Sequence, residues 1–157
     1  MTTENKTFCV LPWIHFAIKV DGLSKPCCRF QTWDNEEEDR NWPELDHNKI
    51  GTKGVVNSKQ FEEVRQAMLR GEKVDGCWKC YKEEAHAGYS MRTAYNDMYP
   101  DINVKQPELK YLEVSFGNYC NLSCRTCNSK LSTTWYDDDV KLDGLYDKVQ
   151  PFPKIME

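Results

Sequence analysis

The chain has 157 residues, 39% of them hydrophobic, which is enough for one ordinary domain or two small ones with a modest core. Lys and Arg number 21 and Asp and Glu 25, which gives a formal net charge of −4; no basic block is present, and this argues against nucleic acid as a partner. No stretch approaches the roughly 18 apolar residues of a membrane span and the amino terminus does not resemble a secretory signal, so we expect a cytoplasmic protein without a membrane partner.

The first predicted element is a β-hairpin. Apolar and polar residues alternate from Trp13 to Val20, which indicates a half-buried strand, and Asp21-Gly22 is typical of a two-residue turn. Residues 23–28 are the expected return strand.

This turn fixes a predicted register. It pairs Ile18 with Lys25, Phe16 with Cys27 and His15 with Cys28. Residues paired across a hairpin share one face of the sheet, so Cys27 is expected on the apolar face and Cys28 on the other. We therefore take Cys27 as a ligand candidate and Cys28 as a structural thiol.

Two further segments follow the hairpin. Residues 31–57 are rich in Asp, Glu, Asn, Pro and Gly, and we predict a solvated connection without a core pattern. Residues 58–70 carry apolar residues at helical spacing, and we predict an amphipathic helix capped by Asn57 or Ser58 and ended by Gly71.

A second helix is predicted from about Trp78 to Met98, with Gly88 as a weak point and Tyr89 among its buried candidates. Residues 109–116 have the composition of the best buried strand in the chain. Three cysteines begin just after this strand, where the ligands of α/β proteins gather.

Eight cysteines in a chain without an export signal are expected to be free thiols that serve metals or catalysis, because a reducing compartment disfavours disulfides. Cys120, Cys124 and Cys127 have the spacing Cys-x3-Cys-x2-Cys. Three thiolates cannot complete a tetrahedral zinc site, whereas a four-iron cluster held by three thiolates keeps one iron open for another molecule. The alternatives are zinc or inert thiols.

This loop, together with the preceding strand, Gly117 and Asn121-Leu122, resembles the signature of the radical SAM superfamily. The resemblance implies a [4Fe-4S] cluster whose open iron binds S-adenosylmethionine, and reductive cleavage of that cofactor to a 5′-deoxyadenosyl radical that abstracts hydrogen from a substrate. It also implies an electron donor such as flavodoxin or ferredoxin. Many members of the superfamily place an aromatic residue just before the last cysteine, where this chain has Thr126.

The earlier cysteines form a second set. Cys9, Gly22 and Cys27 are spaced Cys-x12-Gly-x4-Cys, and Cys77-x2-Cys80 follows. This pattern resembles the twitch domain, half of a SPASM domain, which implies an auxiliary [4Fe-4S] cluster held by the four cysteines. A structural zinc site remains the alternative, because four thiolates satisfy zinc and Cys-x2-Cys is also a zinc-knuckle spacing.

Other polar residues are expected to be structural or exposed and not ligands. These are His15, His47 and His86, the arginines Arg92 and Arg125, and the acidic run Asp137-Asp138-Asp139.

These patterns together predict an α+β protein. Residues 1–104 are expected to form a twitch-like module of a hairpin and helices, and residues 105–157 the first strand and cluster loop of an incomplete radical SAM β/α barrel. A β/α unit needs about 30 residues, so we expect the front part of an enzyme that a carboxyl-terminal portion or a partner chain completes. The alternative is a non-enzymatic iron-sulfur or zinc-binding module for redox chemistry or interaction. The residues do not identify a substrate.

Overall fold

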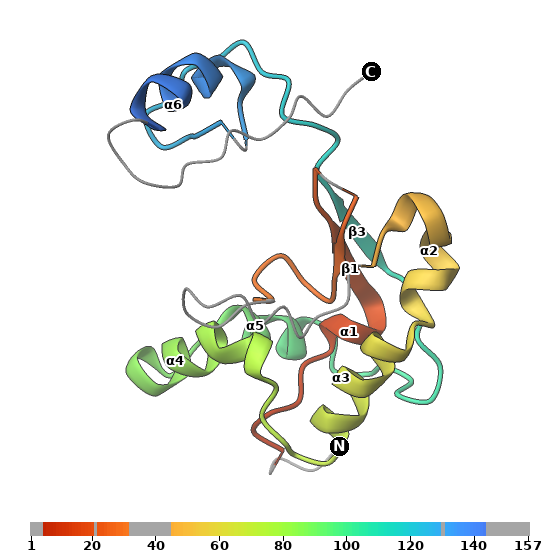
Figure 1. Ribbon diagram of the computed structural model, residues 1–157. Helices are drawn as coiled ribbons and strands as arrows, with labels where there is room; N and C mark the ends of the chain where they lie inside the picture. Colours follow the sequence, from red (N-terminus) through yellow and green to blue (C-terminus); the bar gives the residue numbers. More distant parts are fainter. Residues whose placement is uncertain (1–4, 21, 32–44, 130, 144–157) are drawn as a thin grey trace. The chain divides into compact units, whose positions relative to one another are not determined.

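The computed structural model describes residues 5–20, 22–31, 45–129 and 131–143. Helices and a small three-stranded sheet are both present, which confirms the predicted α+β class (Figure 1). The chain divides into two compact units, one made of the described parts of Met1–Ile18 and Gly22–Glu113, the other of those of Lys19–Asp21 and Val114–Glu157. In these described ranges, no helix is long and apolar enough to cross a membrane.

The sheet of the first unit has the order β2-β1-β3, with β1 at His15–Ile18, β2 at Ser24–Lys25 and β3 at Tyr111–Val114. All four residues of β1 are buried, because this strand lies between the other two and is covered on both faces. The prediction of a half-buried strand from Trp13 was therefore wrong in two respects. The strand is fully buried, and its first two predicted residues, Trp13 and Ile14, belong to the short helix α1, Leu11–Ile14. Pro12 supplies a helical φ in the first turn of α1.

The predicted register of the hairpin is also wrong, by one residue. Ala17 pairs with Lys25 and Ile18 pairs with Ser24. The connection is longer than two residues because β1 ends at Ile18 and Leu23 bridges to Asp46 instead. A shift of one residue exchanges the two faces of a strand.

The two faces of β1 have different neighbours. Phe16 packs edge-on against Phe61 of helix α3 at 6.4 Å between ring centroids. His15 lies on the other face and stacks on Tyr111 at 4.2 Å. By the alternation of strand residues, Lys25, which pairs with Ala17, belongs to the face of His15 and not to that of Phe16.

Part of the predicted solvated connection is helical. Helix α2 spans His47–Val56, starts at Asp46, whose carboxylate accepts a hydrogen bond from the backbone of Asn48, and is interrupted at Gly51 with φ 64°. Val55 and Leu45 are buried. Helix α2 has two glycines and few apolar residues, so burial of Val55 contributes much of its stability, because short helices are marginal by themselves. Residues 32–44 lie outside the described ranges.

Helix α3, Lys59–Leu69, confirms the predicted amphipathic helix. The hydroxyl of Ser58 accepts a hydrogen bond from the backbone N–H of Phe61, and Gly71, with φ 77°, follows the end of the helix. Its buried side chains are Phe61, Val64, Arg65 and Met68. The buried arginine was not expected from the apolar pattern.

The predicted long helix is divided into α4, Trp78–Ala87, and α5, Met91–Met98. Gly88 adopts the left-handed conformation, φ 71°, that ends α4, and Ser90 opens α5 by a reciprocal capping box with Thr93. Tyr89 falls in the connection and is 59% exposed, so its predicted burial was wrong. The short 3-10 turn η1, Asp75–Cys77, precedes α4.

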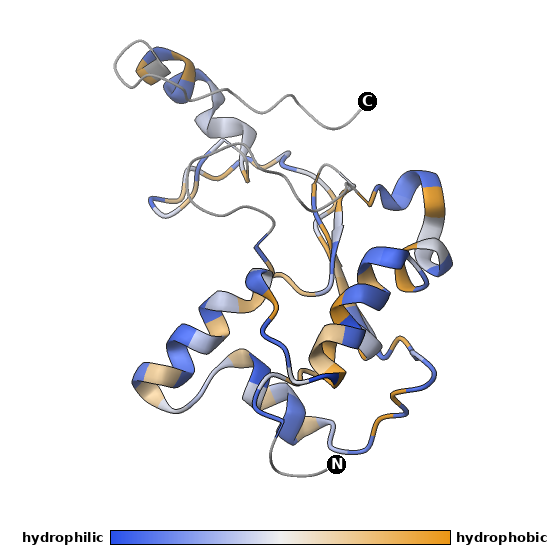
Figure 2. Ribbon diagram, turned by 60° about the horizontal axis from the view of Figure 1, so that its bottom comes forward, coloured by the Kyte–Doolittle hydropathy of each residue, from blue (hydrophilic) through white to orange (hydrophobic). Residues whose placement is uncertain are grey.

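The hydrophobic core of the first unit is formed by residues around α1, by Phe30 and by one face of α3. Its buried members are Cys9, Val10, Leu11, Trp13, Ile14, Phe30, Val64 and Met68. Along the helices of this unit, hydrophobic and hydrophilic residues interchange as expected of amphipathic helices (Figure 2). The strand predicted to be the best buried is half exposed, because β3 is at the edge of the sheet.

The second unit contains the 3-10 turn η2, Thr133–Trp135, and helix α6, Tyr136–Asp143. Its fully buried side chains include the polar residues Asn118, Ser129 and Ser132, while Phe116 is 87% exposed. Hydrogen bonds therefore hold much of this unit, such as that from the backbone of Thr133 to the carbonyl of Asn118 at 2.8 Å.

Candidate metal centre

Four cysteines far apart in the sequence line one cavity in the first unit: Cys9, Cys27, Cys77 and Cys80. They are the four that the sequence assigned to one site, and all are free thiols. The cavity volume is about 20 Å³, room for little more than one water molecule, and the cavity is partly open to solvent. The remaining wall is built from apolar residues and two arginines: Leu11, Phe30, Gly76, Met91, Arg29 and Arg92.

Three of these cysteines are held by local hydrogen-bonded structure. Cys27 opens a turn in which its carbonyl accepts a hydrogen bond from Phe30 N at 3.1 Å. Cys77 closes η1, with its N–H bonded to the carbonyl of Val74 at 2.9 Å, and Cys80 lies in the first turn of α4. The turn, the 3-10 helix and the α-helix thus direct three cysteines from two segments to one cavity.

The neighbouring thiols Cys27 and Cys28 have different surroundings. Cys27 lines the cavity, whereas Cys28 is exposed. Burial and a hydrogen bond with Glu113 raise the pKa of Cys28. The register used to choose Cys27 was wrong, since Lys25 pairs with Ala17 and not with Ile18. The pairing also stops at Lys25, so the turn that follows, and not the strand, sets the direction of Cys27.

Burial and electrostatic repulsion between the thiolates raise the pKa of thiols in the cavity. Burial raises the pKa of Cys9 and Cys77 well above the ordinary value and that of Cys27 to about 12. The charge of Cys27 adds to the rise at Cys9, and both act on Cys77. Without a cation these thiols are protonated at neutral pH, so binding of a metal group must release protons.

Two arginines bring positive charge to the wall. Arg29 forms a bidentate pair with Glu83 at 2.5 and 2.6 Å. Arg92 is only 6% exposed, so the prediction that it lies at the surface was wrong. Its guanidinium lowers the pKa of Cys9 and Cys77, although burial outweighs this effect. A wall of this charge favours an anionic occupant.

Zinc and a four-iron cluster differ in the spacing of thiolates that they require. A tetrahedral zinc ion with bonds of about 2.3 Å needs its sulfurs about 3.8 Å apart, nearly in contact, whereas a four-iron cluster meets each thiolate with a different iron. Among the described residues, no group of three or more His, Cys, Asp or Glu is placed to hold a single ion. Four thiols on the wall of one cavity are a donor set that suits either a zinc ion or an iron-sulfur cluster.

The histidines lie elsewhere. His15 is 2% exposed and burial lowers its pKa; its Nδ1 lies 3.3 Å from the carbonyl oxygen of Tyr111. His47 contacts Thr52, and His86 contacts the carbonyl of Lys82 in its own helix. No histidine is among the described residues that line the cavity.

The second cysteine set lies in the other unit on a loop open to solvent. Cys124 is exposed, and Cys120 and Cys127 are partly exposed. The backbone N–H of Leu122 donates to the sulfur of Cys120 at 3.4 Å, and Cys127 N bonds to the carbonyl of Cys124 at 2.9 Å.

Hydroxyl groups from η2 hold the start of this loop. Thr134 and Thr133 donate to the carbonyl of Cys120 at 2.6 and 3.4 Å. Arg125 is exposed as expected, and Tyr119 is exposed as well. The structure thus orders the backbone of the loop while its side chains face solvent.

Of the residues that support Cys9, sequence reasoning missed Asn96, took Arg92 for a structural or exposed residue and gave Glu84 no role. The capping box Ser90-x-x-Thr93 was a readable signal for the helix that carries two of them. Burial of an arginine has no comparable local signature. No protein-family model, curated protein or solved structure matches the chain, so the functional argument depends on its own residues.

Proposed function

We propose that the chain is an iron-sulfur protein of the radical SAM type with two [4Fe-4S] clusters. Cys9, Cys27, Cys77 and Cys80 hold an auxiliary cluster, and Cys120, Cys124 and Cys127 hold the cluster that binds S-adenosylmethionine. The observation that carries this proposal is the cavity in which four cysteines from three segments of the chain meet.

Three properties of the cavity favour a cluster there. Thiolates are the ligands that iron-sulfur clusters prefer. Arg29 and Arg92 in the wall favour the net negative charge of a cluster with four thiolate ligands. The apolar part of the wall, including Leu11 and Phe30, limits access of water, which also affects the reduction potential.

The proposal for the second site depends on the resemblance of the loop to radical SAM proteins. Three thiolates leave one iron for the amino and carboxylate groups of S-adenosylmethionine. When bound, this pair supplies a 5′-deoxyadenosyl radical for hydrogen abstraction. The N–H of Leu122 that donates to Cys120 supports the assignment, since such hydrogen bonds to ligand sulfurs stabilise thiolate charge.

Metal analysis after anaerobic purification tests the cluster assignment. We expect about eight irons and eight sulfides per chain, as two cubane clusters. Replacing Cys77 and Cys80 by Ala should remove one half of the iron, and replacing Cys120, Cys124 and Cys127 the other half. Stoichiometric zinc without sulfide would refute both assignments and would support the alternative of a non-enzymatic zinc module.

A second measurement tests the enzymatic part. The chain, reduced with dithionite, should release 5′-deoxyadenosine from S-adenosylmethionine, but slowly, because Tyr119 and Leu122 leave the loop open to solvent. A carboxyl-terminal portion or partner chain that encloses the cofactor should raise the rate. Full iron content without any cleavage, with or without such a partner, would leave a non-enzymatic redox or interaction module as the function.

A further inference from the structure

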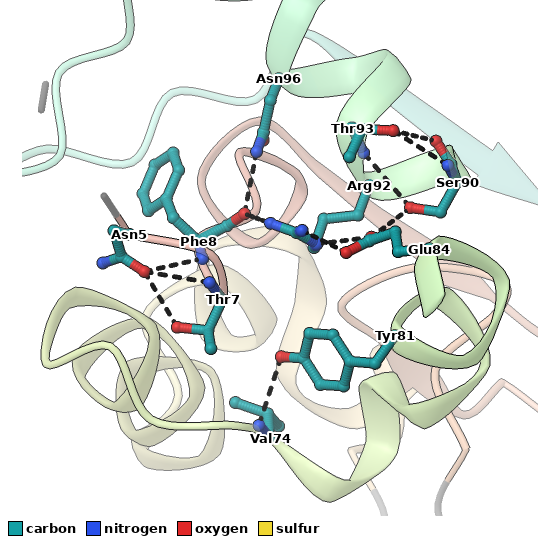
Figure 3. Close-up of polar contacts among 10 residues, drawn as sticks. All are labelled: Asn5, Thr7, Phe8, Val74, Tyr81, Glu84, Ser90, Arg92, Thr93 and Asn96. Atoms are coloured by element: carbon teal, nitrogen blue, oxygen red, sulfur yellow. Dashed lines mark hydrogen bonds and ion pairs between the residues drawn. The ribbon is translucent and has the colours of Figure 1, made fainter. Parts of the chain in front are cut away.

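Helix α5 binds the backbone on both sides of Cys9. Figure 3 shows its contacts with Phe8, the residue before Cys9. The side chain of Asn96 donates to the carbonyl of Phe8 at 2.8 Å and accepts from the N–H of Val10 at 2.9 Å. Arg92 donates to the same Phe8 carbonyl at 2.6 Å. Two side chains of one helix therefore hold the residue before Cys9 and the residue after it.

A third side chain, that of Asn5, orders the residues that lead to this segment. The amide oxygen of Asn5 accepts hydrogen bonds from the backbone of Thr7 and Phe8, both at 3.1 Å. The residues that precede Cys9 thus have their polar backbone groups committed to side chains instead of a helix or a sheet. Cys9 itself is buried and lines the cavity.

Several contacts fix the position of the Arg92 guanidinium. It forms two hydrogen bonds with the carboxylate of Glu84, at 2.9 and 2.5 Å, and Ser90 donates to the same carboxylate at 2.5 Å. The ring of Tyr81 lies 5.8 Å from the guanidinium carbon. A charge with these contacts stays in the wall of the cavity.

We propose that Arg92 and Asn96 are positioning residues of the cavity site: together they aim Cys9 into the cavity, and Arg92 in addition favours the reduced state of the group bound there. The first part concerns the protein alone. The second part rests on the proposed auxiliary cluster and extends it, because it assigns residues that set its reduction potential.

The redox step takes up one electron. A low-potential one-electron reductant is oxidised, and the cluster with its four thiolates becomes more negative by one charge. The positive charge of Arg92 stabilises the more negative state, and the negative charge of Glu84 opposes it. Removal of either charge must therefore shift the reduction potential, and the two shifts must have opposite signs.

The metal-free protein tests the positioning of Cys9. We expect Asn96→Ala to raise the rate at which iodoacetamide alkylates Cys9, on the order of tenfold, because two hydrogen bonds to its flanking backbone are lost. Peptide mass spectrometry measures the rate. Asn57→Ala is the matched control, since Asn57 also binds a backbone carbonyl, that of Lys53, but at the surface. Equal rates in the two variants would overturn the positioning role.

Redox titration of the reconstituted protein tests the role of charge. At a fixed potential, Arg92→Gln should lower the ratio of reduced to oxidised auxiliary cluster, on the order of tenfold, and Glu84→Gln should raise it. Arg92→Lys keeps the charge and should stay near the unmodified protein. Arg70→Gln, which breaks an exposed pair with Glu72, should change nothing.

Two results would overturn the proposed effect of Arg92 on the reduction potential. One is a shift of the same sign for Arg92→Gln and Glu84→Gln, which a general loosening of the fold would give. The other is a shift in Arg92→Lys as large as that in Arg92→Gln. If Arg92→Gln takes up no iron, Arg92→Lys and Glu84→Gln still decide the question. A protein that binds no iron at all refutes the proposed function, while the alkylation result stands by itself.

Discussion

Gly76 is the residue where a single methyl group should do most damage to the cavity. It directly precedes Cys77, and both line the cavity with Phe30. A Cβ atom at Gly76 would lie 2.5 and 2.6 Å from the two Cε atoms of the Phe30 ring, well inside van der Waals contact. Gly76→Ala therefore requires the ring or the backbone to move.

The ring has little freedom to do so. Phe30 is 3% exposed, and its backbone closes the turn of Cys27 and accepts a hydrogen bond from Lys25 at 2.9 Å. Inserting a methyl group into such a packed site costs about 1–3 kcal/mol. For a unit of this size, 1 kcal/mol lowers the melting temperature by about 4 °C, so we expect a decrease of about 4–12 °C.

Thermal melting of the metal-free protein by circular dichroism measures this effect. Phe30→Leu removes part of the ring, so the double variant Gly76→Ala/Phe30→Leu should be more stable than the sum of the single changes implies. Gly71→Ala is the control: its Cβ meets no atom within 4 Å, and only its φ of 77° is strained. Wild-type melting of Gly76→Ala, or strict additivity in the double variant, would refute the reasoning.

Three further predictions concern metal retention, stability and pH. Cys27→Ala should lose the metal of the first unit and Cys28→Ala should keep it, because only Cys27 lines the cavity; equal iron loss would contradict this. Arg65→Leu should cost about 2–4 kcal/mol in urea denaturation, since Arg65 binds the buried carbonyls of Pro12 and Val56, whereas the exposed Arg70→Leu should cost under about 0.5 kcal/mol. Burial opposes ionisation of Glu84, but hydrogen bonds from Arg92 and Ser90 lower its pKa below 4.5, so this pair stabilises the fold above that pH and is lost as pH falls through the lowered pKa. Melting curves from pH 7 to 3 should therefore fall less steeply for Glu84→Gln than for the wild type, and parallel curves would contradict the prediction.

Local patterns in the sequence determined the elements that depend on local chemistry. The α+β class and helix α3 follow from apolar periodicity, and the ends of α3 follow from Ser58 and Gly71. The four cysteines that line one cavity were selected by the resemblance of their spacing to the twitch pattern. The contacts that determine helix α3 and its ends are between residues close in the chain. Cysteine is a rare residue with specific chemistry, so its spacing is informative.

Only the tertiary structure determined the features that depend on residues far apart in the sequence. The register of the hairpin differs by one residue because Leu23 bridges to Asp46, outside the hairpin. Strand β3 is half exposed because it is at the edge of the sheet, a position that its own composition does not encode. Arg92 is buried because its charge is balanced by Glu84 and its donors meet the Phe8 carbonyl, 84 residues away in the sequence. Hydrogen bonds and ion pairs across such separations exist only after the fold has formed, and they set the surroundings of Cys9.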